Sequence, residues 1–308
     1  MLIILKLSAT SGFAQDANKI KWFENADGFN KKRLTNISVL GSVGYTGTLI
    51  ILNKYWYSNY ARSSFHFFND NNEWNQVDKA GHVITSYYFG KAGIDLMNWA
   101  GVKNKKSTIY GGLLGSVLLT NIEILDGFSS KWGASLGDIT ANSIGSIVVI
   151  AQDWFWDEQK VHLKYSFKKP TYSSDIQNRT DQLFGNHLSE QLLKDYNGQT
   201  YWVSANIKSF ILKSSKIPNW LNLSLGYGAE GMLGSTTNYY SIGDEAFDHT
   251  DIERFRQYYF SFDIDLTRIE TKSKILKIFT NVFGFIKIPA PTFEFNKIDK
   301  FKFHYFYF

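Results

Sequence analysis

Apolar residues gather in four long runs in the first half of the chain. The runs cover residues 34–52, 75–99, 107–125 and 135–156. Each has the length of a helix, and Gly101 after the second run is a typical helix stop. Each is also shorter than, or only marginal for, the roughly 20 residues that span a bilayer. We therefore predict an N-terminal bundle of about four apolar helices, buried or lying at an interface.

Small residues within two of these runs suit close contact between helices. Gly41, Gly44 and Gly47 lie three residues apart, and Gly111 and Gly115 have the GxxxG spacing. A face of small residues lets two helix backbones approach closely. We expect both faces to pack against neighbouring helices.

After residue 157 the pattern changes to alternation of apolar and polar residues, which is typical of strands with two unlike faces. Tyr258, Phe260 and Phe262 share one face of such a strand, and Asp263 lies on the other. The alternating segments are residues 161–167, 201–211, 221–227 and 258–267. The pattern predicts an antiparallel β region.

The chain ends in an aromatic strand at residues 301–308, with Phe as its final residue. Exported outer-membrane barrels commonly end in this way, but about five or six strands are too few for a bacterial barrel, which needs at least eight. Residues 187–194 are expected to form a short helix. Residues 275–285 fit no single pattern, and Pro289 and Pro291 are expected to break the element they follow.

These patterns together predict an α+β fold in three parts. Residues 1–14 resemble an export signal, with Gly12 and Ala14 at the −3 and −1 positions of a cleavage site, although no Lys precedes the apolar stretch. The alternative is a frayed hydrophobic N-terminus. Residues 15–157 are expected to form the helical domain. Residues 158–308 are expected to form the antiparallel β domain, as an open sheet or a partial barrel.

The amino-acid composition favours a membrane-associated protein. Aromatic residues make up 17% of the chain, and rings of this kind suit strands and membrane interfaces. The net charge of +5 fits an anionic surface such as phospholipid or lipopolysaccharide, whereas no Lys/Arg cluster indicates a nucleic-acid partner. The chain contains no Cys, which excludes thiol chemistry, Cys-ligated metals and a lipid-modified Cys within these residues.

Ionisable residues gather near the ends of the predicted helices. Asp78, His82 and Ser86 share one helix face at i, i+4 and i+8, and Asp138 and Asn142 share another. Carboxylates at these positions have a structural explanation as well, because a capping box at a helix start retains an Asp without any chemistry.

The capping explanation applies to two of the carboxylates. Asn75-x-x-Asp78 and Ser135-x-x-Asp138 both fit the capping-box spacing. Capping leaves His82 unexplained, one turn beyond the first of these carboxylates. Either His82 is a core histidine hydrogen-bonded to Asp78 or Ser86, or its tautomer is fixed for metal binding or general-base work.

Glu123 raises a similar question at the end of a Gly-rich apolar helix. Ser116 and Thr120 lie on its face of the helix and are its expected local partners. An unpaired buried carboxylate would have a raised pKa or would require a cation, for which Lys79 or His82 is the obvious candidate. We therefore predict a buried polar network across three helices, which either binds a ligand or fixes the packing.

This network gives the candidate site. His82, Glu123 and Asp78 are the candidate catalytic residues, and a divalent metal is a possible cofactor. The candidate binding residues are Asp78, Lys79, His82, Ser86, Glu123, Asp126, Ser130, Asp138 and Asn142. The sequence has no HExxH or Walker motif, and the glycine-rich run at residues 226–231 follows a predicted strand with no helix after it. It therefore favours a non-enzymatic role without excluding catalysis.

The order and spacing of these residues resemble a known family. The motifs are Asp78-Lys79-x-x-His82, Glu123-x-x-Asp126-Gly127-Phe128-Ser129 and Gly137-Asp138-x-x-Ala141-Asn142-x-x-Gly145. Over roughly residues 56–159 they resemble the YfiM-like family of uncharacterised predicted periplasmic or outer-membrane proteins, whose core is similar to the VanZ-like helical family. The resemblance implies a cell-envelope setting and no known activity. The short family members look like lipoproteins, whereas this chain has no Cys to acylate.

Three functional hypotheses follow. The first is an exported, membrane-associated envelope protein at the outer membrane or a periplasmic membrane surface. Its polar network would bind a lipid or glycan envelope component or a partner protein, such as an outer-membrane protein. The second is a membrane-interface hydrolase that uses Asp78, His82 and Glu123, with or without a metal. The third is a structural packing unit for an outer-membrane sheet.

Overall fold

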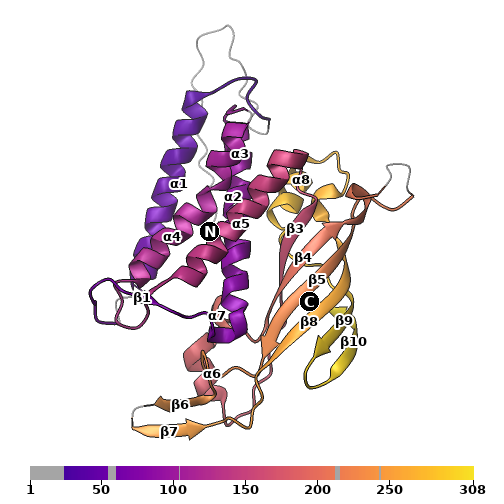
Figure 1. The fold of residues 1–308 in the computed structure, drawn as a ribbon. Helices are drawn as coiled ribbons and strands as arrows, with labels where there is room; N and C mark the ends of the chain where they lie inside the picture. Colours follow the sequence, from indigo (N-terminus) through magenta and orange to yellow (C-terminus); the bar gives the residue numbers. More distant parts are fainter. Residues whose placement is uncertain (1–23, 55–59, 104, 212–215, 243) are drawn as a thin grey trace, which may run out of the picture.

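The computed structural model describes residues 24–54, 60–103, 105–211, 216–242 and 244–308. Figure 1 shows a group of helices formed by the first half of the chain beside a sheet formed by the second half. The predicted α+β fold is confirmed at this level. The predicted export signal at residues 1–14 lies outside the described residues.

The helical half has a packed core and one helix that stands apart. Its helices are α1 (Lys31–Leu52), α2 (Val77–Trp99), α3 (Lys105–Gly112), α4 (Leu114–Asp126) and α5 (Leu136–Trp156). A Cβ atom added to Gly115 would lie 2.0 Å from the backbone oxygen of Ser86, so α4 contacts α2 backbone to backbone. The same test at Gly111 gives 2.4 Å to the nitrogen of Ile94. The predicted close packing of Gly111 and Gly115 is therefore confirmed, although the run 107–125 is divided into two helices.

Helix α1 does not join this core. No atom lies within 4 Å of a Cβ added to Gly41, Gly44 or Gly47, so the prediction that this face packs against a neighbouring helix is wrong within the described residues. The helix is held by polar contacts, since the guanidinium of Arg33 donates to the backbone oxygen of Trp99 at 2.9 Å and the hydroxyl of Tyr45 donates to that of Leu118 in α4 at 2.7 Å. The predicted four-helix bundle is not confirmed, because α1 leaves its apolar side chains exposed.

Two helical segments are long and apolar enough to cross a membrane. They are Lys31–Leu52, which contains no buried residue in its most apolar window, and Lys105–Asp126, which is 33% buried there. Core helices of soluble proteins and signal sequences also meet this criterion.

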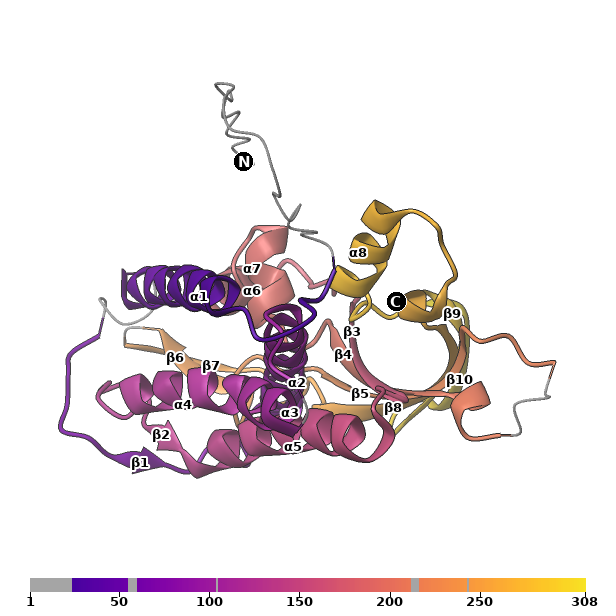
Figure 2. The ribbon, with the colours of Figure 1, turned by 90° about the horizontal axis from the view of Figure 1, so that it is seen from above.

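The second half forms one six-stranded antiparallel sheet. Its strands are β3 (Val161–Phe167), β4 (Gln199–Asn206), β5 (Leu221–Glu230), β8 (Phe255–Ile264), β9 (Ala290–Asn296) and β10 (Lys300–Tyr307). Their order is β10-β9-β8-β5-β4-β3. Figure 2 shows that the sheet curves strongly but that β3 and β10 stay separate edges, so it is open. One loop partly covers the β3 edge, where Tyr165 donates its N–H to Phe285 at 2.8 Å and accepts that of Lys287 at 2.9 Å.

Several shorter elements refine the predictions. The expected short helix at residues 187–194 is confirmed as α7 (Leu188–Lys194), and residues 275–285 form mostly helix α8 (Lys274–Val282). Strand β4 ends at Asn206, earlier than predicted, because the Asn206 side chain accepts the N–H of Ser209 and starts a 3₁₀ turn. The shorter elements are α6 (Gln177–Phe184), α7 (Leu188–Lys194), α8 (Lys274–Val282), β1 (Phe67–Phe68), β2 (Ala134–Ser135), β6 (Tyr239–Ile242) and β7 (Glu245–Asp248).

The element expected to end before Pro289 and Pro291 is α8, which ends at Val282, and Pro291 itself lies inside the next strand, β9. The pairing of β9 with β8 extends only as far as Thr292, so the missing N–H of Pro291 disrupts no bond on that side.

The sheet buries its polar face and exposes its apolar face, which is the reverse of a sheet in a soluble protein. On its inner face, the side chains of Lys164, Lys287 and Asp263 are fully buried. On its outer face, Phe262 is 50% exposed and Leu225 is 62% exposed. The predicted alternation is correct, but the polar face is the buried one.

Candidate functional site

Three helix ends bring the predicted polar residues together. Asp78 and Lys79 lie in the first turn of α2, Glu123 lies in the last turn of α4, and Asp138 lies in the first turn of α5. We call these residues, with Asp70, His82, Ser86, Ser135 and Asn142, the polar cluster. Pairing of β1 with β2 places Asp70 beside Ser135, whose hydroxyl donates to the Asp70 carboxylate at 2.6 Å. The predicted network across three helices therefore exists, and it extends to a loop.

Lys79 is the centre of one half of the cluster. Its Nζ lies 2.7 Å from Asp70, 3.1 Å from Asp78 and 2.8 Å from Asp138. Burial by itself would lower the pKa of Lys79, but the surrounding carboxylates outweigh burial and raise that pKa. Lys79 is thus a charged internal cation for these three carboxylates.

His82 occupies the other half of the cluster. Its Nδ1 lies 3.0 Å from the side-chain oxygen of Asn142, so the partner is neither Asp78 nor Ser86, as the sequence suggested. Ser86 instead donates to the backbone oxygen of Asn142 at 2.6 Å. The opposite ring nitrogen, Nε2, faces Asp138 Oδ1 at 3.6 Å.

Glu123 is 2% exposed and lies close to His82, with Oε1 4.0 Å from the ring. Its other oxygen accepts the backbone N–H of Ser135 at 3.2 Å. The expected partner Ser116 is bonded elsewhere, to the backbone oxygen of Asn142. Burial raises the pKa of Glu123 to about 8, and the neighbouring Asp138 adds to this shift. Glu123 is therefore a mostly neutral acid near pH 7.

The capping predictions have opposite outcomes. Ser135 caps α5 as expected, because its hydroxyl accepts the N–H of Asp138 at 3.0 Å. Asn75 does not cap α2, so the capping box predicted at Asn75-x-x-Asp78 is wrong. Burial raises the pKa of Asp78, and the adjacent Lys79 opposes that shift.

The start of α2 is a strained turn fixed by the sheet. Trp74, Asn75 and Gln76 have φ values of 47°, 48° and 63°, in the left-handed region that costs non-glycine residues about 1–3 kcal/mol each. The hydroxyl of Tyr227 donates to the backbone oxygen of Asn75, and Arg256 donates to the Gln76 side chain at 2.6 Å. These contacts from β5 and β8 set the position of the first turn of α2, and with it Asp78 and Lys79.

Two predicted residues lie at the margin of the cluster, and one important residue was not predicted. Asp126 is half-buried one turn beyond Glu123 and helps to raise the pKa of Glu123. Ser130 is exposed, and its backbone N–H bonds to Ala61. Asp70 was missed, because its loop has no periodicity that would place it; the only signal is its position in a polar run.

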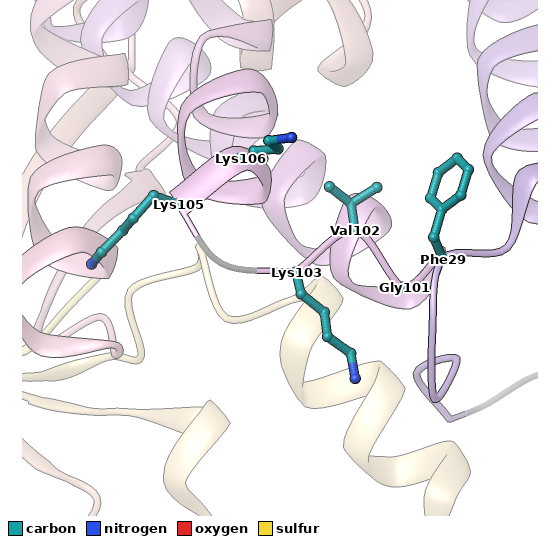
Figure 3. Close-up of a pocket in the computed structure, with 6 residues that line it drawn as sticks. All are labelled: Phe29, Gly101, Val102, Lys103, Lys105 and Lys106. Carbon is teal, nitrogen blue, oxygen red and sulfur yellow. The ribbon is translucent and has the colours of Figure 1, made fainter.

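A pocket of about 520 Å³ lies at the opposite end of α2 (Figure 3). It is lined by Phe29, Gly101, Val102, Lys103, Lys105 and Lys106. Lys103 donates to the backbone oxygen of Asp27, and Lys105 donates to that of Trp154. Because these two cations already have partners within the chain, the polar cluster is the stronger candidate site.

The polar cluster lies within the part of the chain that matches a sequence family. Residues 66–152 match the family model described as "Predicted periplasmic lipoprotein (DUF2279)". The matched segment of the chain contains every residue of the polar cluster and none of the six-stranded sheet. The match supports an exported, periplasmic setting of unknown activity. No curated protein and no solved structure matches the chain.

Proposed function

We propose that the chain is an exported cell-envelope protein that lies with the outer face of its sheet against membrane lipid and presents the polar cluster as a binding site for an envelope component. One observation carries the membrane part of this proposal, namely the inverted burial of the sheet. A sheet surrounded by water turns its apolar face towards the core. Sheets in membranes do the opposite, with apolar residues outward and polar residues inward.

The charged side chains on the inner face of the sheet are paired with each other and with backbone oxygens, which keeps that face inside. Lys164 Nζ lies 2.7 Å from Asp263 and also donates to the backbone oxygen of Ile264. Lys287 donates to the backbone oxygens of Phe262 at 2.9 Å and Ile288 at 2.8 Å. Buried charges are stable only with partners of this kind. The polar face therefore cannot exchange places with the apolar face.

The outer face presents a continuous set of large apolar side chains. From β5 to β10 they are Leu223, Leu225, Tyr258, Phe260, Phe262, Phe293, Phe295, Phe301, Phe303 and Tyr305, each at least 36% exposed. Covering half of one such side chain is worth about 1 kcal/mol, so covering this face would contribute on the order of 10 kcal/mol. This is enough to hold the protein at a membrane.

Lipid fits this surface better than a single protein partner does. The apolar exterior continues onto the helical half, where Leu40 of α1 is 72% exposed and Phe155 of α5 is 75% exposed. Figure 2 shows α1 on the opposite side of the molecule from β9 and β10. A partner protein would cover one patch, whereas acyl chains can contact all of these surfaces.

The absence of Cys from the sequence allows a direct test with single-Cys variants. Leu225→Cys and Phe262→Cys place an environment-sensitive fluorophore on the outer face, and Thr250→Cys places it in an exposed loop beyond the sheet. With protein reconstituted into phospholipid vesicles, we expect quenchers on the acyl chains to quench the first two labels several-fold more than the third. Equal quenching at all three positions would refute the orientation.

The hydrolase and packing-unit hypotheses remain predictions. His82 has the surroundings of a general base, but no contact of the described residues identifies a nucleophile or a substrate. Binding of a lipid or glycan headgroup at the polar cluster can be examined by adding soluble headgroup analogues and recording chemical shifts of His82, which is 26% exposed. Absence of any shift would count against the binding site.

A further inference from the structure

The polar cluster has more negative charge than its own cation can balance. Four carboxylates, those of Asp70, Asp78, Asp138 and Glu123, surround a single Lys79. Lys79 can balance one of these four carboxyl groups, and the space around them is largely buried. Buried charges of one sign require protons or a cation. Lys79 already pairs with Asp70, Asp78 and Asp138. The side of the cluster that faces His82 therefore has carboxyl groups without a second cation among the described residues.

The geometry at His82 indicates where a cation would bind. An amide oxygen can only accept, so His82 donates from Nδ1 to Asn142, and Nε2 is the ring nitrogen left to ligate a metal. Nε2 faces Asp138 Oδ1 at 3.6 Å, which is too long for a hydrogen bond. Nε2 of His82 therefore faces a carboxylate that Lys79 holds at 2.8 Å, without bonding to it.

A buried polar atom beside His82 supports the same conclusion. Asn142 is fully buried, and its amide nitrogen has no acceptor, although its amide oxygen bonds to His82. Buried polar groups normally have partners, so this unpartnered nitrogen requires an explanation. An ion with a bound oxygen ligand beside His82 would supply the acceptor.

We propose that His82, Glu123 and Asp138 bind one Zn²⁺ ion. One ligand atom from each residue lies within 4.8 Å of the other two. A tetrahedral Zn²⁺ with bonds of about 2.1 Å holds its ligand atoms about 3.4 Å apart, which is close to the 3.6 Å between His82 and Asp138. Small side-chain rotations would close the set around an ion.

The donor set favours zinc over the common hard cations. One imidazole and two carboxylates suit Zn²⁺, whereas Ca²⁺ and Mg²⁺ prefer six or more oxygen ligands. Three protein ligands leave a fourth position open, and the partly exposed His82 provides an entry side. The bond from Nδ1 to Asn142 fixes the ring orientation, as the outer partners of metal-bound histidines commonly do. This inference goes beyond the proposed function, because it does not depend on lipid.

The test is a Zn²⁺ titration of the full chain in detergent after removal of metals with EDTA. We expect wild type to bind one Zn²⁺, and Co²⁺ at the same site to give the visible absorption bands of a tetrahedral nitrogen and oxygen set. Glu123→Gln and His82→Ala should each weaken binding by at least about 100-fold, because loss of a ligand costs more than loss of an outer partner. Gln has the shape of a neutral Glu, so Glu123→Gln is expected to fold and decides the test if His82→Ala does not.

Asp95→Asn provides a matched control. It removes an exposed carboxylate that pairs with Lys91 in the second half of α2, so it should bind Zn²⁺ within a few-fold of wild type. Failure of wild type to bind Zn²⁺ in stoichiometric amount would overturn the proposal. So would equal binding by wild type and Glu123→Gln, or an equal loss in Asp95→Asn and Glu123→Gln, which would indicate non-specific binding by carboxylates.

Discussion

Replacement of Asp263 by Asn would leave two ammonium groups inside the sheet without their counter-charge. Lys164 lies 2.7 Å and Lys287 lies 4.0 Å from this carboxylate, and all three side chains are fully buried. Asn keeps the shape and can still bond to Ser204, which donates to Asp263 in the wild type at 2.6 Å. The substitution therefore removes charge with little change in packing.

The expected loss is large. Removal of one partner of a buried ion pair costs about 3–5 kcal/mol, because the other charge stays buried and unpaired. A second substitution, Lys164→Met, should recover part of this loss in the Asp263→Asn background, since only Lys287 then lacks a counter-charge. The coupling between Asp263 and Lys164 is expected to be about 1–3 kcal/mol.

Denaturant unfolding in detergent micelles, followed by circular dichroism, measures these differences. Asp299→Asn is the matched control, because Asp299 pairs with Lys302 at 3.5 Å on the surface, where both side chains are about half exposed. Such pairs contribute about 0–1 kcal/mol. If Asp263→Asn costs no more than Asp299→Asn, water reaches the inner face of the sheet and the case for a lipid-facing outer surface is lost.

Three further perturbations probe the helical half. In metal-free protein the pKa of Glu123 is raised to about 8, so between pH 5 and 8 the folded chain keeps a proton that the unfolded chain has released. The free energy of unfolding should therefore fall by about 1.4 kcal/mol per pH unit over this range. Glu123→Gln should abolish this slope in denaturant titrations. Gly115→Ala forces a Cβ against Ser86 and should cost more than about 2 kcal/mol, whereas Gly44→Ala meets no atom and should stabilise α1 slightly, as thermal unfolding will show. Ser135→Ala should cost about 1 kcal/mol through loss of the α5 cap, and an unchanged melting temperature would contradict this assignment.

Five of the six strands of the sheet were predictable because their signal is local, whereas β9 was not predicted. Alternation follows directly from strand geometry, so β3 was predicted to the residue and β10 to within one residue. Alternation does not say which face is buried, since that depends on what surrounds the sheet. The sequence thus placed Phe260 and Asp263 on opposite faces but did not reveal that Asp263 is the inner residue.

The polar cluster was predictable in its membership and not in its contacts. Helix spacing places Asp78 near His82, but the bond of His82 to Asn142 depends on how α5 crosses α2. Helical periodicity contains no information about that crossing. Asp70 was missed for the same reason, because a loop residue reaches Lys79 only through the pairing of β1 with β2.

The strained turn before α2 also has a consequence for the order in which the protein is made. The bond from Tyr227 to Asn75 joins residues 152 positions apart, and the bond from Arg256 to Gln76 joins residues 180 positions apart. A ribosome completes the helices long before it completes the strands that fix this turn. The newly made N-terminal half therefore has to wait for the sheet before its polar residues reach their final places, and a chain truncated near residue 157 should contain helices with an unfinished site.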